Sequence, residues 1–369
     1  MISFKKLEKI MDRTAPLRYA YEWDNSGPTI VTHDSVKKIL LAVDVTDDVV
    51  DEAIECGCDT IISHHPLIFK PIKKLLPDDP TGSIVLKAVE HGLNLYAAHT
   101  SFDCANGGIN DLLADDLMLK NKRLFIRETS DRWKKIVVFA PLDDEDKVKE
   151  ALFEAGAGKQ GDYSCVSFTA MGTGEFLPNM FAKPAIGRRG VKEEVEECRI
   201  ECFCPAYLAD EAVRAVKAVH SYEEPAIDVY DLDYPRTDAG LGMVGELVAP
   251  MDTESFVGYV KKRLGAAAVR FSGDCGRIST VACVGGSGGE LFKEAKAAGA
   301  DALVTGEAKY NHFIDAAASG IVLVEAGHYD TERAFTAAMM KHLQKAFNEV
   351  QCNTGLYVSM RGMRPYDIE

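Results

Sequence analysis

Apolar and polar residues follow two different periods in the first third of the chain. Residues 36–46 read VKKILLAVDVT, residues 47–57 read DDVVDEAIECG and residues 58–66 read CDTIISHHP. The outer two segments are apolar runs rich in β-formers, and the middle one has Thr46 as an N-cap followed by acidic residues. This order predicts a β-α-β unit and a parallel sheet. A helix that ends near Gly92 and a strand within LNLYAAHTSFD continue the pattern.

The same order of elements returns near the C-terminus. From Ile278 the chain reads ISTVACVGG, SGGELFKEAKAAG, ADALVTGEA, a helix through NHFIDAAASG and the strand IVLVEAGHYDTE. Laying the two stretches over each other pairs His65 with Glu307, His99 with His328, and Asp103 with Glu332. We interpret this as an internal duplication. Both copies end a strand with His-x-x-x-carboxylate, and ligands of open α/β sheets lie beyond the carboxyl ends of the strands.

A different block, residues 131–240, separates the two copies. It contains the strand WKKIVVFAP, the helix LDDEDKVKEALFEAG, the strand RIECFCP, the helix ADEAVRAVKAVH and the strand AIDVYDL. The glycine-rich segments MGTGEFLP and AIGRRG are expected to form loops between its two halves. This outline predicts a ferredoxin-like α+β insert. The expected fold is therefore α/β, with residues 1–130 and 241–369 forming two β-α-β-type halves of one domain around the insert.

Composition and charge narrow the possible functions. A chain of 369 residues exceeds the size at which one hydrophobic core usually stops growing, which favours two domains. Its formal charge of −15 makes nucleic acid an unlikely partner. No apolar run has the length of a signal peptide or a membrane span, so we expect a cytoplasmic protein without a membrane partner. The ten cysteines are then expected to be reduced thiols that are mostly buried.

The sharpest candidate for chemistry is the pair His64 and His65, which follows the apolar strand DTIIS. Adjacent side chains on an extended strand point to opposite sides, so both histidines can reach one metal site only if the chain turns there. Pro66 favours such a turn, because a proline restricts the residue before it. Without further ligands, the pair could equally be two hydrogen-bonded loop histidines.

Three more residues favour the metal interpretation. His328 offers another imidazole nitrogen, and Asp103 and Glu332 offer oxygens that can bridge two cations. Five such ligands are too few for two separate closed sites, and they suit two neighbouring ions about 3.5 to 4 Å apart. The sequence therefore predicts two divalent ions per chain, and zinc, iron, manganese, nickel and cobalt all accept these ligands. Glu332 could alternatively be a solvent-facing acid in the first turn of an amphipathic helix.

Other residues near these positions have less defined roles. His99 mirrors His328 and is our candidate catalytic residue, as a proton shuttle or as a group that orients a ligand. Glu307 and His312 could orient ligands, or they could be an ordinary loop acid and a helix histidine. The run GGSGGELF at 285–292 could hold an anion, but it lacks a Walker lysine and the dinucleotide spacing of glycines. The alternative is a tight connection packed against the sheet.

Taken together, the segments EWDNSG, ISHHPLIF, AAHTSFD, TGEAKYNH and EAGHYDTE resemble a family of dinuclear-metal-centre proteins. These are the GTP cyclohydrolase I type 2 homologues, also called NIF-three-like proteins. The resemblance implies metal ligands at five positions, namely His64, His65, Asp103, His328 and Glu332. It also implies a homohexameric ring with metal sites that face an internal cavity. The central block is similar to the insert of the longer bacterial members, which resembles trimeric signalling-protein and copper-tolerance-protein folds.

Two functions follow as hypotheses. The first is a metal-dependent hydrolase that acts on a nucleotide or a related small molecule, such as GTP by resemblance. Mixed histidine and carboxylate ligands favour this function, because they are usual where open coordination serves catalysis. The second is a non-catalytic ring protein for metal trafficking or regulation, which the long insert of regulatory type favours.

Overall fold

The computed structural model describes residues 1–127, 132–235, 239–362 and 364–365. The chain forms two compact units, one from Met1–Arg127 together with Thr237–Glu369 and the other from Glu128–Arg236. Helices and sheets are both abundant, so the fold is a mixed α/β fold with several sheets. No helix in the described part of the chain is long and apolar enough to cross a membrane. All ten cysteines are free thiols, and six of them are buried, namely Cys58, Cys104, Cys198, Cys202, Cys204 and Cys283.

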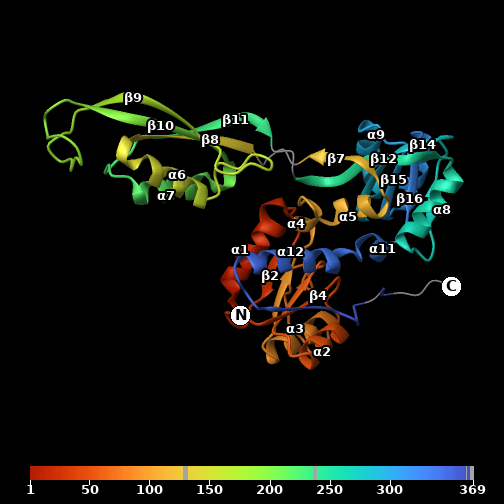
Figure 1. The fold of residues 1–369 in the computed structure, drawn as a ribbon. Coiled ribbons are helices and arrows are strands. Elements are labelled where there is room, and N and C mark those ends of the chain that lie inside the picture. The colour runs from red at the N-terminus through yellow and green to blue at the C-terminus, as the bar shows by residue number, and fades with distance from the viewer. Residues whose placement is uncertain (128–131, 236–238, 363, 366–369) are drawn as a thin grey trace. The chain divides into compact units, whose positions relative to one another are not determined.

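The first sheet of the larger unit has the strand order β17-β4-β5-β6-β2. Its strands are β17 (Gly355–Val358), β4 (Lys38–Ala42), β5 (Thr60–Ser63), β6 (Asn94–Ala97) and β2 (Gly27–Ile30), and only β2 is antiparallel to its neighbour. Helices α1 (Phe4–Thr14) and α12 (Phe335–Glu349) cover one face, and α2 (Asp47–Glu55) and α3 (Pro80–Glu90) cover the other (Figure 1). A short pair, β1 (Ile2–Ser3) and β3 (Ser35–Val36), precedes this sheet.

The alternation of side chains along β4 explains why helices pack on both faces of this sheet. Ile39 and Leu41 pack with α1 and α12, whereas Leu40 packs with α2 and α3. Successive side chains of a strand point to opposite faces, so a continuous apolar run supplies both cores. Thr46 caps α2 as predicted, because its side chain accepts a hydrogen bond from the Val49 amide.

The second sheet of the larger unit has the order β13-β16-β15-β14-β12-β7. Its strands are β13 (Arg270–Ser272), β16 (Val322–Glu325), β15 (Ala302–Glu307), β14 (Ile278–Ser287), β12 (Gly240–Met251) and β7 (Lys120–Arg127). The three central strands β14, β15 and β16 are parallel, and the outer pairings are antiparallel. One face packs on α5 (Ile109–Asp116) and α8 (Thr253–Leu264), and the other on α9 (Phe292–Ala297) and α10 (Tyr310–Ala318).

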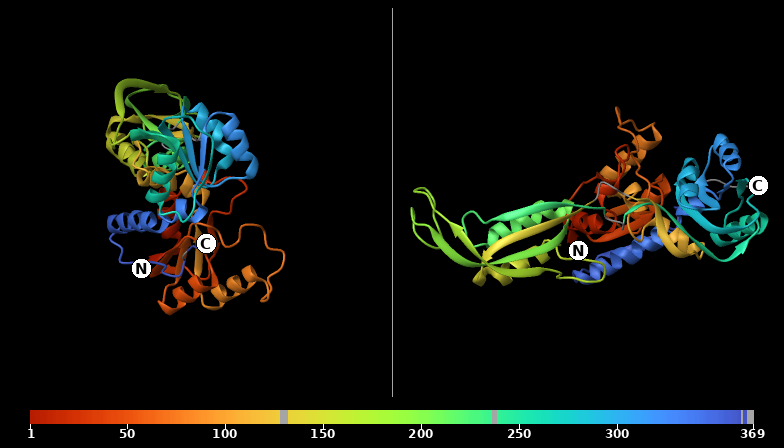
Figure 2. Two further views of the ribbon diagram at one scale, coloured as in Figure 1. Left: turned by 90° about the vertical axis from the view of Figure 1, so that its right-hand side faces the viewer. Right: turned by 90° about the horizontal axis from the view of Figure 1, so that it is seen from above.

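The smaller unit runs in the order β8 (Arg132–Pro141), α6 (Glu145–Glu154), β9 (Phe168–Phe176), β10 (Glu193–Pro205), α7 (Ala209–Val219) and β11 (Ile227–Pro235). Its antiparallel sheet has the order β11-β8-β10-β9, with α6 and α7 against one face. β9 and β10 form a long hairpin that extends beyond the two helices (Figure 2). Cys202 and Cys204 both face the core of this unit.

Two local predictions were wrong. The segment MGTGEF belongs to strand β9 and not to a loop. A Cβ atom at Gly174 would lie 2.2 Å from the Glu197 carboxylate of the neighbouring strand, so the glycine makes room for that side chain. Glu332 is not in the first turn of an amphipathic helix either, because it ends the short helix α11 (His328–Glu332), and α12 begins separately at Phe335.

Candidate metal centre

His64 and His65 lie at the carboxyl end of β5, where the main chain continues the parallel ladder. The His64 amide donates to the Ala42 carbonyl at 3.2 Å, and the His65 amide donates to the Val43 carbonyl at 2.9 Å. The two imidazole rings nevertheless lie side by side, with centroids 4.9 Å apart. The chain therefore turns after β5, and both side chains reach the same place.

Each ring is fixed through its Nδ1 atom. Nδ1 of His64 lies 2.9 Å from the Ala98 carbonyl, which can only accept, so this nitrogen carries the proton. Nδ1 of His65 lies 2.8 Å from Oδ1 of Asp44, and Nδ1 of His328 lies 3.1 Å from Oε1 of Glu307. Histidines that bind metals are usually held this way, with the second nitrogen turned to the ion.

The two carboxylates come from short helices that follow strands β6 and β16. Asp103 ends α4 (Thr100–Asp103), and Glu332 ends α11, one helical turn after His328. Positions i and i+4 share one face of a helix, so the His-x-x-x-carboxylate pattern brings both side chains of α11 to the centre. Asp330 lies between them in the sequence, and its buried carboxylate binds Arg364 at 2.5 Å.

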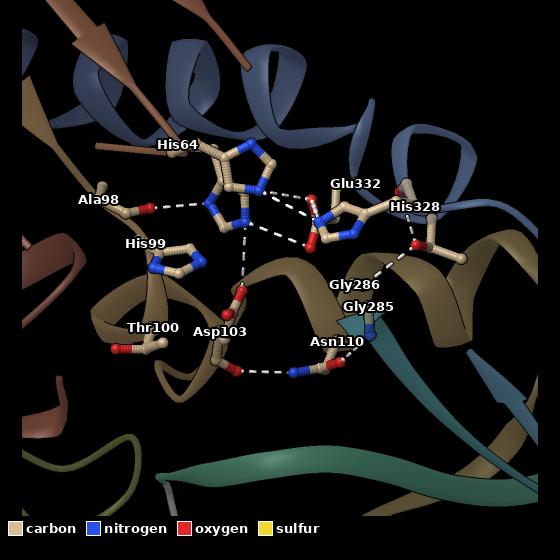
Figure 3. Close-up of polar contacts among 12 residues, drawn as sticks. His64, Ala98, His99, Thr100, Asp103, Asn110, Gly285, Gly286, His328 and Glu332 are labelled. Atoms are coloured by element: carbon tan, nitrogen blue, oxygen red, sulfur yellow. Dashed lines mark hydrogen bonds and ion pairs between the residues drawn. The ribbon is translucent and has the colours of Figure 1, made fainter. Parts of the chain in front are cut away.

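Glu332 lies among the three histidines (Figure 3). Its Oε2 atom is 3.1 Å from Nε2 of His65 and 3.1 Å from Nε2 of His328. Its Oε1 atom is 3.6 Å from Nε2 of His64. Oδ1 of Asp103 is also 3.6 Å from Nε2 of His64. The structure thus brings all five sequence-predicted ligand residues together.

The unpaired atoms of this cluster test whether a metal fits. With the histidine protons on Nδ1, three buried ligand atoms of the described residues have no hydrogen-bond partner, namely Nε2 of His64, Oδ1 of Asp103 and Oε2 of Glu332. Orphaned buried polar atoms are rare in proteins, and they often indicate an absent ion. With the protons on Nδ1, the Nε2 atoms of His65 and His328 present lone pairs to each other across 3.3 Å. A metal ion between them, or an added proton on one ring, relieves this repulsion, and the nitrogen and oxygen atoms fit divalent metal ions.

Without metal, protons take the place of the cations. Burial alone would lower the pKa of His65, but its hydrogen bonds to Asp44 and Glu332 raise that pKa to about 10. Burial, together with the nearby charge of Glu332, raises the pKa of Asp103 to about 7. For Glu332, burial would raise the pKa, but the positive charge and hydrogen bonds of the histidines hold it well below its ordinary range.

These shifts predict that metal-free protein loses stability as the pH rises. The folded-state pKa of His65, about 10, lies above its ordinary value of 6.5, so the stabilisation is complete below pH 6.5 and is lost on the way to pH 10. The raised pKa of Asp103 acts in the same direction between pH 3.8 and about 7. We expect a loss of roughly 2–5 kcal/mol in the free energy of unfolding between pH 6.5 and 10.

Urea unfolding of chelator-treated protein at these two pH values measures this loss. His65→Gln should show a much flatter dependence in the same window. Equal stability of the unsubstituted protein at both pH values would contradict the assignment of the proton to His65.

His99 extends the cluster on the side of His64 and His65. Its ring centroid lies 5.3 Å from those of both other histidines. Its Nδ1 atom is 2.7 Å from Oδ1 of Asp24, whose side chain is fully buried. Two groups of three possible metal ligands result, and within each group the ligand atoms lie within 4.8 Å of one another. One group is His64, His65 and His99, and the other is His65, His328 and Glu332.

Gly285 and Gly286, near the end of strand β14 where its pairing with β15 shifts register, lie against the Glu332 side chain. A Cβ atom at Gly286, where φ is +60°, would lie 2.4 Å from Oε1 of Glu332. The Gly285 amide donates to Oδ1 of Asn110 at 2.9 Å, and Nδ2 of Asn110 donates to the Asp103 carbonyl at 2.8 Å. The glycine-rich run is therefore a tight connection that lets the backbone approach the carboxylates, and its amides at 285 and 286 bind protein side chains.

We expect Gly286→Ala to weaken metal binding about 10-fold or more, because its methyl group displaces the Glu332 carboxylate. Gly276→Ala is the matched control, since φ there is +73° and nothing lies within 4 Å of the added Cβ. Both variants carry the cost of a left-handed alanine, about 1 kcal/mol. Competition with a chelating dye measures the dissociation constant for zinc. Equal affinities of the two variants would contradict this close approach.

Sequence reasoning missed three residues that hold the cluster in place: Asp44, Asp24 and Asn110. Asp44 follows β4 in the same way that His65 follows β5, two residues after the paired strand ends Ala42 and Ser63, so its place beyond a predicted parallel strand was a usable signal. Asp24 belongs to the segment EWDNSG, where no local pattern indicates a contact with His99. Glu307 lies beside His328, whereas His312 accepts from the Lys309 amide at 3.3 Å, at the start of α10.

Comparison with known proteins agrees with this architecture. A family model described as Duf34/NIF3 (NGG1p interacting factor 3) matches residues 2–362. A Halalkalibacterium halodurans protein named GTP cyclohydrolase 1 type 2 homolog is 37% identical over 360 residues, which span 97% of this chain and 96% of that protein. The Bacillus subtilis protein of the same name is 35% identical over 367 residues, which span 99% of this chain and 98% of that protein.

A solved structure is similar to this chain over its whole length. The crystal structure of a Bacillus cereus protein related to NIF3 matches with a TM-score of 0.90 and 36% identity, over 100% of this chain and 99% of that chain. The family match and these relatives cover nearly all of the sequence, including both sheets and the smaller unit. This chain therefore belongs to the Duf34/NIF3 family.

Proposed function

We propose that this protein is a metal-dependent hydrolase that acts on a nucleotide or a related small molecule. Two divalent ions would be held by His64, His65, Asp103, His328 and Glu332. The observation that carries this proposal is the set of buried, unpartnered ligand atoms on His64, Asp103 and Glu332. A set of buried lone pairs and carboxylates without partners is destabilising by itself, and cations offset that cost.

Glu332 is the proposed shared ligand. One of its oxygens lies equally close to His65 and His328, and the other faces His64. Such a carboxylate can hold two ions, with Asp103 beside His64 as an additional oxygen. When bound, two ions supply Lewis-acid activation of a water molecule for attack on an electrophilic carbon, such as C8 of a guanine ring, or on phosphorus.

His99 is the proposed catalytic residue. The hydrogen bond from its Nδ1 atom to Asp24 fixes the tautomer, so Nε2 is free to accept a proton. Burial would raise the pKa of Asp24, but hydrogen bonds from His99, Ser26 and Thr100 keep it lowered, and this carboxylate therefore stays ionised. An ionised partner stabilises the imidazolium that forms when His99 takes up a proton, as in other histidine–carboxylate pairs.

A reaction assay tests this function. Metal-loaded protein is incubated with GTP, and formate is measured beside a His64→Ala, His328→Ala double variant as control. Formate above the control supports the cyclohydrolase version, and its absence removes that version. An untargeted screen of metabolite turnover with the same pair of proteins then tests the wider hydrolase proposal, which fails if no metabolite is consumed in a metal-dependent way.

A metal-trafficking or regulatory function is the second candidate. The smaller unit favours it, because this unit has its own hydrophobic core and contributes none of the five proposed ligands. Metal off-rates distinguish the two functions. Exchange within seconds suits a carrier, whereas ions that persist through dialysis suit a catalyst.

We also propose three features of the architecture. The first is duplication, supported by a run of three parallel strands in each sheet, β4-β5-β6 and β14-β15-β16, and by a His-x-x-x-carboxylate segment with a short helix after β6 and after β16. The second is a ferredoxin-like insert, supported by its β-α-β-β-α-β order. The third is a homohexameric ring, which sedimentation analysis of the full chain would test by its mass.

A further inference from the structure

Three aromatic side chains gather on the surface beside His99. Tyr21 and Trp23 are stacked, with ring centroids 5.6 Å apart and planes inclined by 18°. Phe69 lies in the loop after β5, and its ring centroid is 5.9 Å from that of Trp23. Trp23 is 61% exposed despite these neighbours, and Phe69 is 45% exposed. We call Tyr21, Trp23 and Phe69 the aromatic platform.

The platform is continuous with the candidate metal centre. The rings of Trp23 and Phe69 meet the His99 ring edge to face, with centroids 6.2 Å and 6.1 Å away. His99 in turn lies 5.3 Å from His64 and His65. A group bound on the exposed part of Trp23 is therefore separated from the proposed metal ligands by a single imidazole ring.

Hydrogen bonds hold the platform rigidly. Asp24, next to Trp23, accepts from Oγ1 of Thr100 at 2.6 Å as well as binding His99. Nδ2 of Asn25 donates to the Ile68 carbonyl at 2.6 Å, directly before Phe69. The backbone on both sides of the platform is thus tied to the residues of the centre. A preorganised ring loses little conformational entropy when a ligand binds on it.

Charge near the platform indicates the kind of ligand. Lys70 is next to Phe69, and Lys73 and Lys74 follow in the same exposed loop before Asp78 and Asp79, whereas Glu22 is exposed between Tyr21 and Trp23. Exposed aromatic faces bind planar rings by stacking, and lysines attract anions. The aromatic faces suit a planar aromatic ring, and the lysines on the Phe69 side suit an anionic group attached to that ring.

We propose that Trp23 is the stacking residue for the aromatic ring of the ligand on which the metal centre acts. This inference rests on the proposed function, because His99 connects the two sites. A second copy of the chain is the competing occupant of the platform. The contact with His99 favours a ligand of the centre, because a protein partner that covered Trp23 would also cover the 14% of the His99 side chain that is exposed.

Tryptophan fluorescence tests the proposal in the full chain loaded with zinc. The sequence has only two tryptophans, so Trp133→Phe leaves Trp23 as the sole reporter. GMP, CMP and neopterin are titrated as ring-bearing probes, and ribose 5-phosphate is the control without a ring. We expect at least one ring-bearing probe to quench Trp23 and to bind more tightly than ribose 5-phosphate. If no ring-bearing probe exceeds ribose 5-phosphate, the proposal is overturned.

Two variants in the otherwise unchanged chain assign the effect to stacking. Trp23→Leu should weaken binding of the ring-bearing probe about 5- to 150-fold, the cost of losing one base–aromatic stack. Trp23→Phe should keep most of the affinity, since it keeps an aromatic face. Calorimetric titration measures both, and unchanged affinity in Trp23→Leu overturns the proposal. A lower sedimentation mass of Trp23→Leu without any ring-dependent binding would assign the platform to a contact between copies and also overturns it.

Metal analysis of the same samples tests the aromatic platform and the hydrolase proposal separately. Zinc retained in Trp23→Leu together with weakened ring binding supports the platform. Ring binding that depends on Trp23 in a protein that holds no metal leaves the platform standing and removes the hydrolase. Zinc that is retained in a protein whose ligand binding does not depend on an aromatic ring leaves the hydrolase proposal standing and removes the platform.

Discussion

Glu332→Gln is expected to remove both metal ions from the protein. Glu332 is 2% exposed and faces three histidines, so no other carboxylate can take its place without moving α11. The amide keeps the size of the side chain but loses its charge and one of its two acceptor oxygens. A residue that only orients a ligand typically costs about 10- to 100-fold in metal affinity, and the loss of a shared ligand should exceed that range.

Elemental analysis after dialysis measures the effect. We expect about two ions per chain in the unsubstituted protein, and fewer than about half an ion in Glu332→Gln. His99→Gln is the control, because its ring lies beside the centre but is held by Asp24; it should keep most of its metal. The fold of Glu332→Gln should survive, since the amide can donate to the imidazole nitrogens that face it. Two ions retained by Glu332→Gln would refute the shared-ligand assignment.

The second large effect is a selective loss of thermal stability when the metal is removed. Ions that bind only the folded state stabilise it by about 4 kcal/mol for each site held at roughly a thousand times its dissociation constant. In a unit of this size, each kcal/mol corresponds to about 2–4 °C in melting temperature. Chelation should therefore lower the melting temperature of the larger unit by about 8–16 °C, and by more if both sites are this tight.

The smaller unit is an internal control for this experiment. None of the proposed ligands belongs to it, and its core is built from its own strands and helices. Calorimetry follows the two transitions, and hydrogen exchange assigns them: amides of β15 and α11 should lose protection on chelation, whereas those of β8 and β10 should not. Equal loss of protection in both units would show that the metal stabilises the chain by some route other than the proposed centre.

Local pattern was sufficient to predict the elements that carry the centre. The apolar strands, the Thr46 cap and the His-x-x-x-carboxylate spacing are all short-range signals, and ligand residues beyond parallel strand ends converge for geometric reasons. Such signals say little about the groups around the ligands. Asp44 lies 21 positions from His65 and Asp24 lies 75 positions from His99, so only tertiary packing brings these pairs together.

The glycines also show what local sequence patterns cannot predict. The abundance of glycine in MGTGEF suggested a loop, but this segment is part of strand β9. There Gly174 leaves the space that the Glu197 side chain of the neighbouring strand fills. At Gly286 the reason is again a distant side chain, Glu332. Intrinsic preference alone cannot distinguish a glycine that bends the chain from one that makes room for a neighbour.

The way the smaller unit joins the larger one has a consequence for how this family can evolve. Arg127 at the end of β7 pairs with Gly240 at the start of β12, as the last residues of a β-hairpin do, and the whole smaller unit occupies the place of the hairpin turn. Lengthening a turn costs little free energy, about 0.6 kcal/mol for each doubling of its length. A lineage can therefore gain, lose or exchange this module by recombination at one turn while every strand pairing of the larger unit keeps its register. Selection can then act on the two units almost independently.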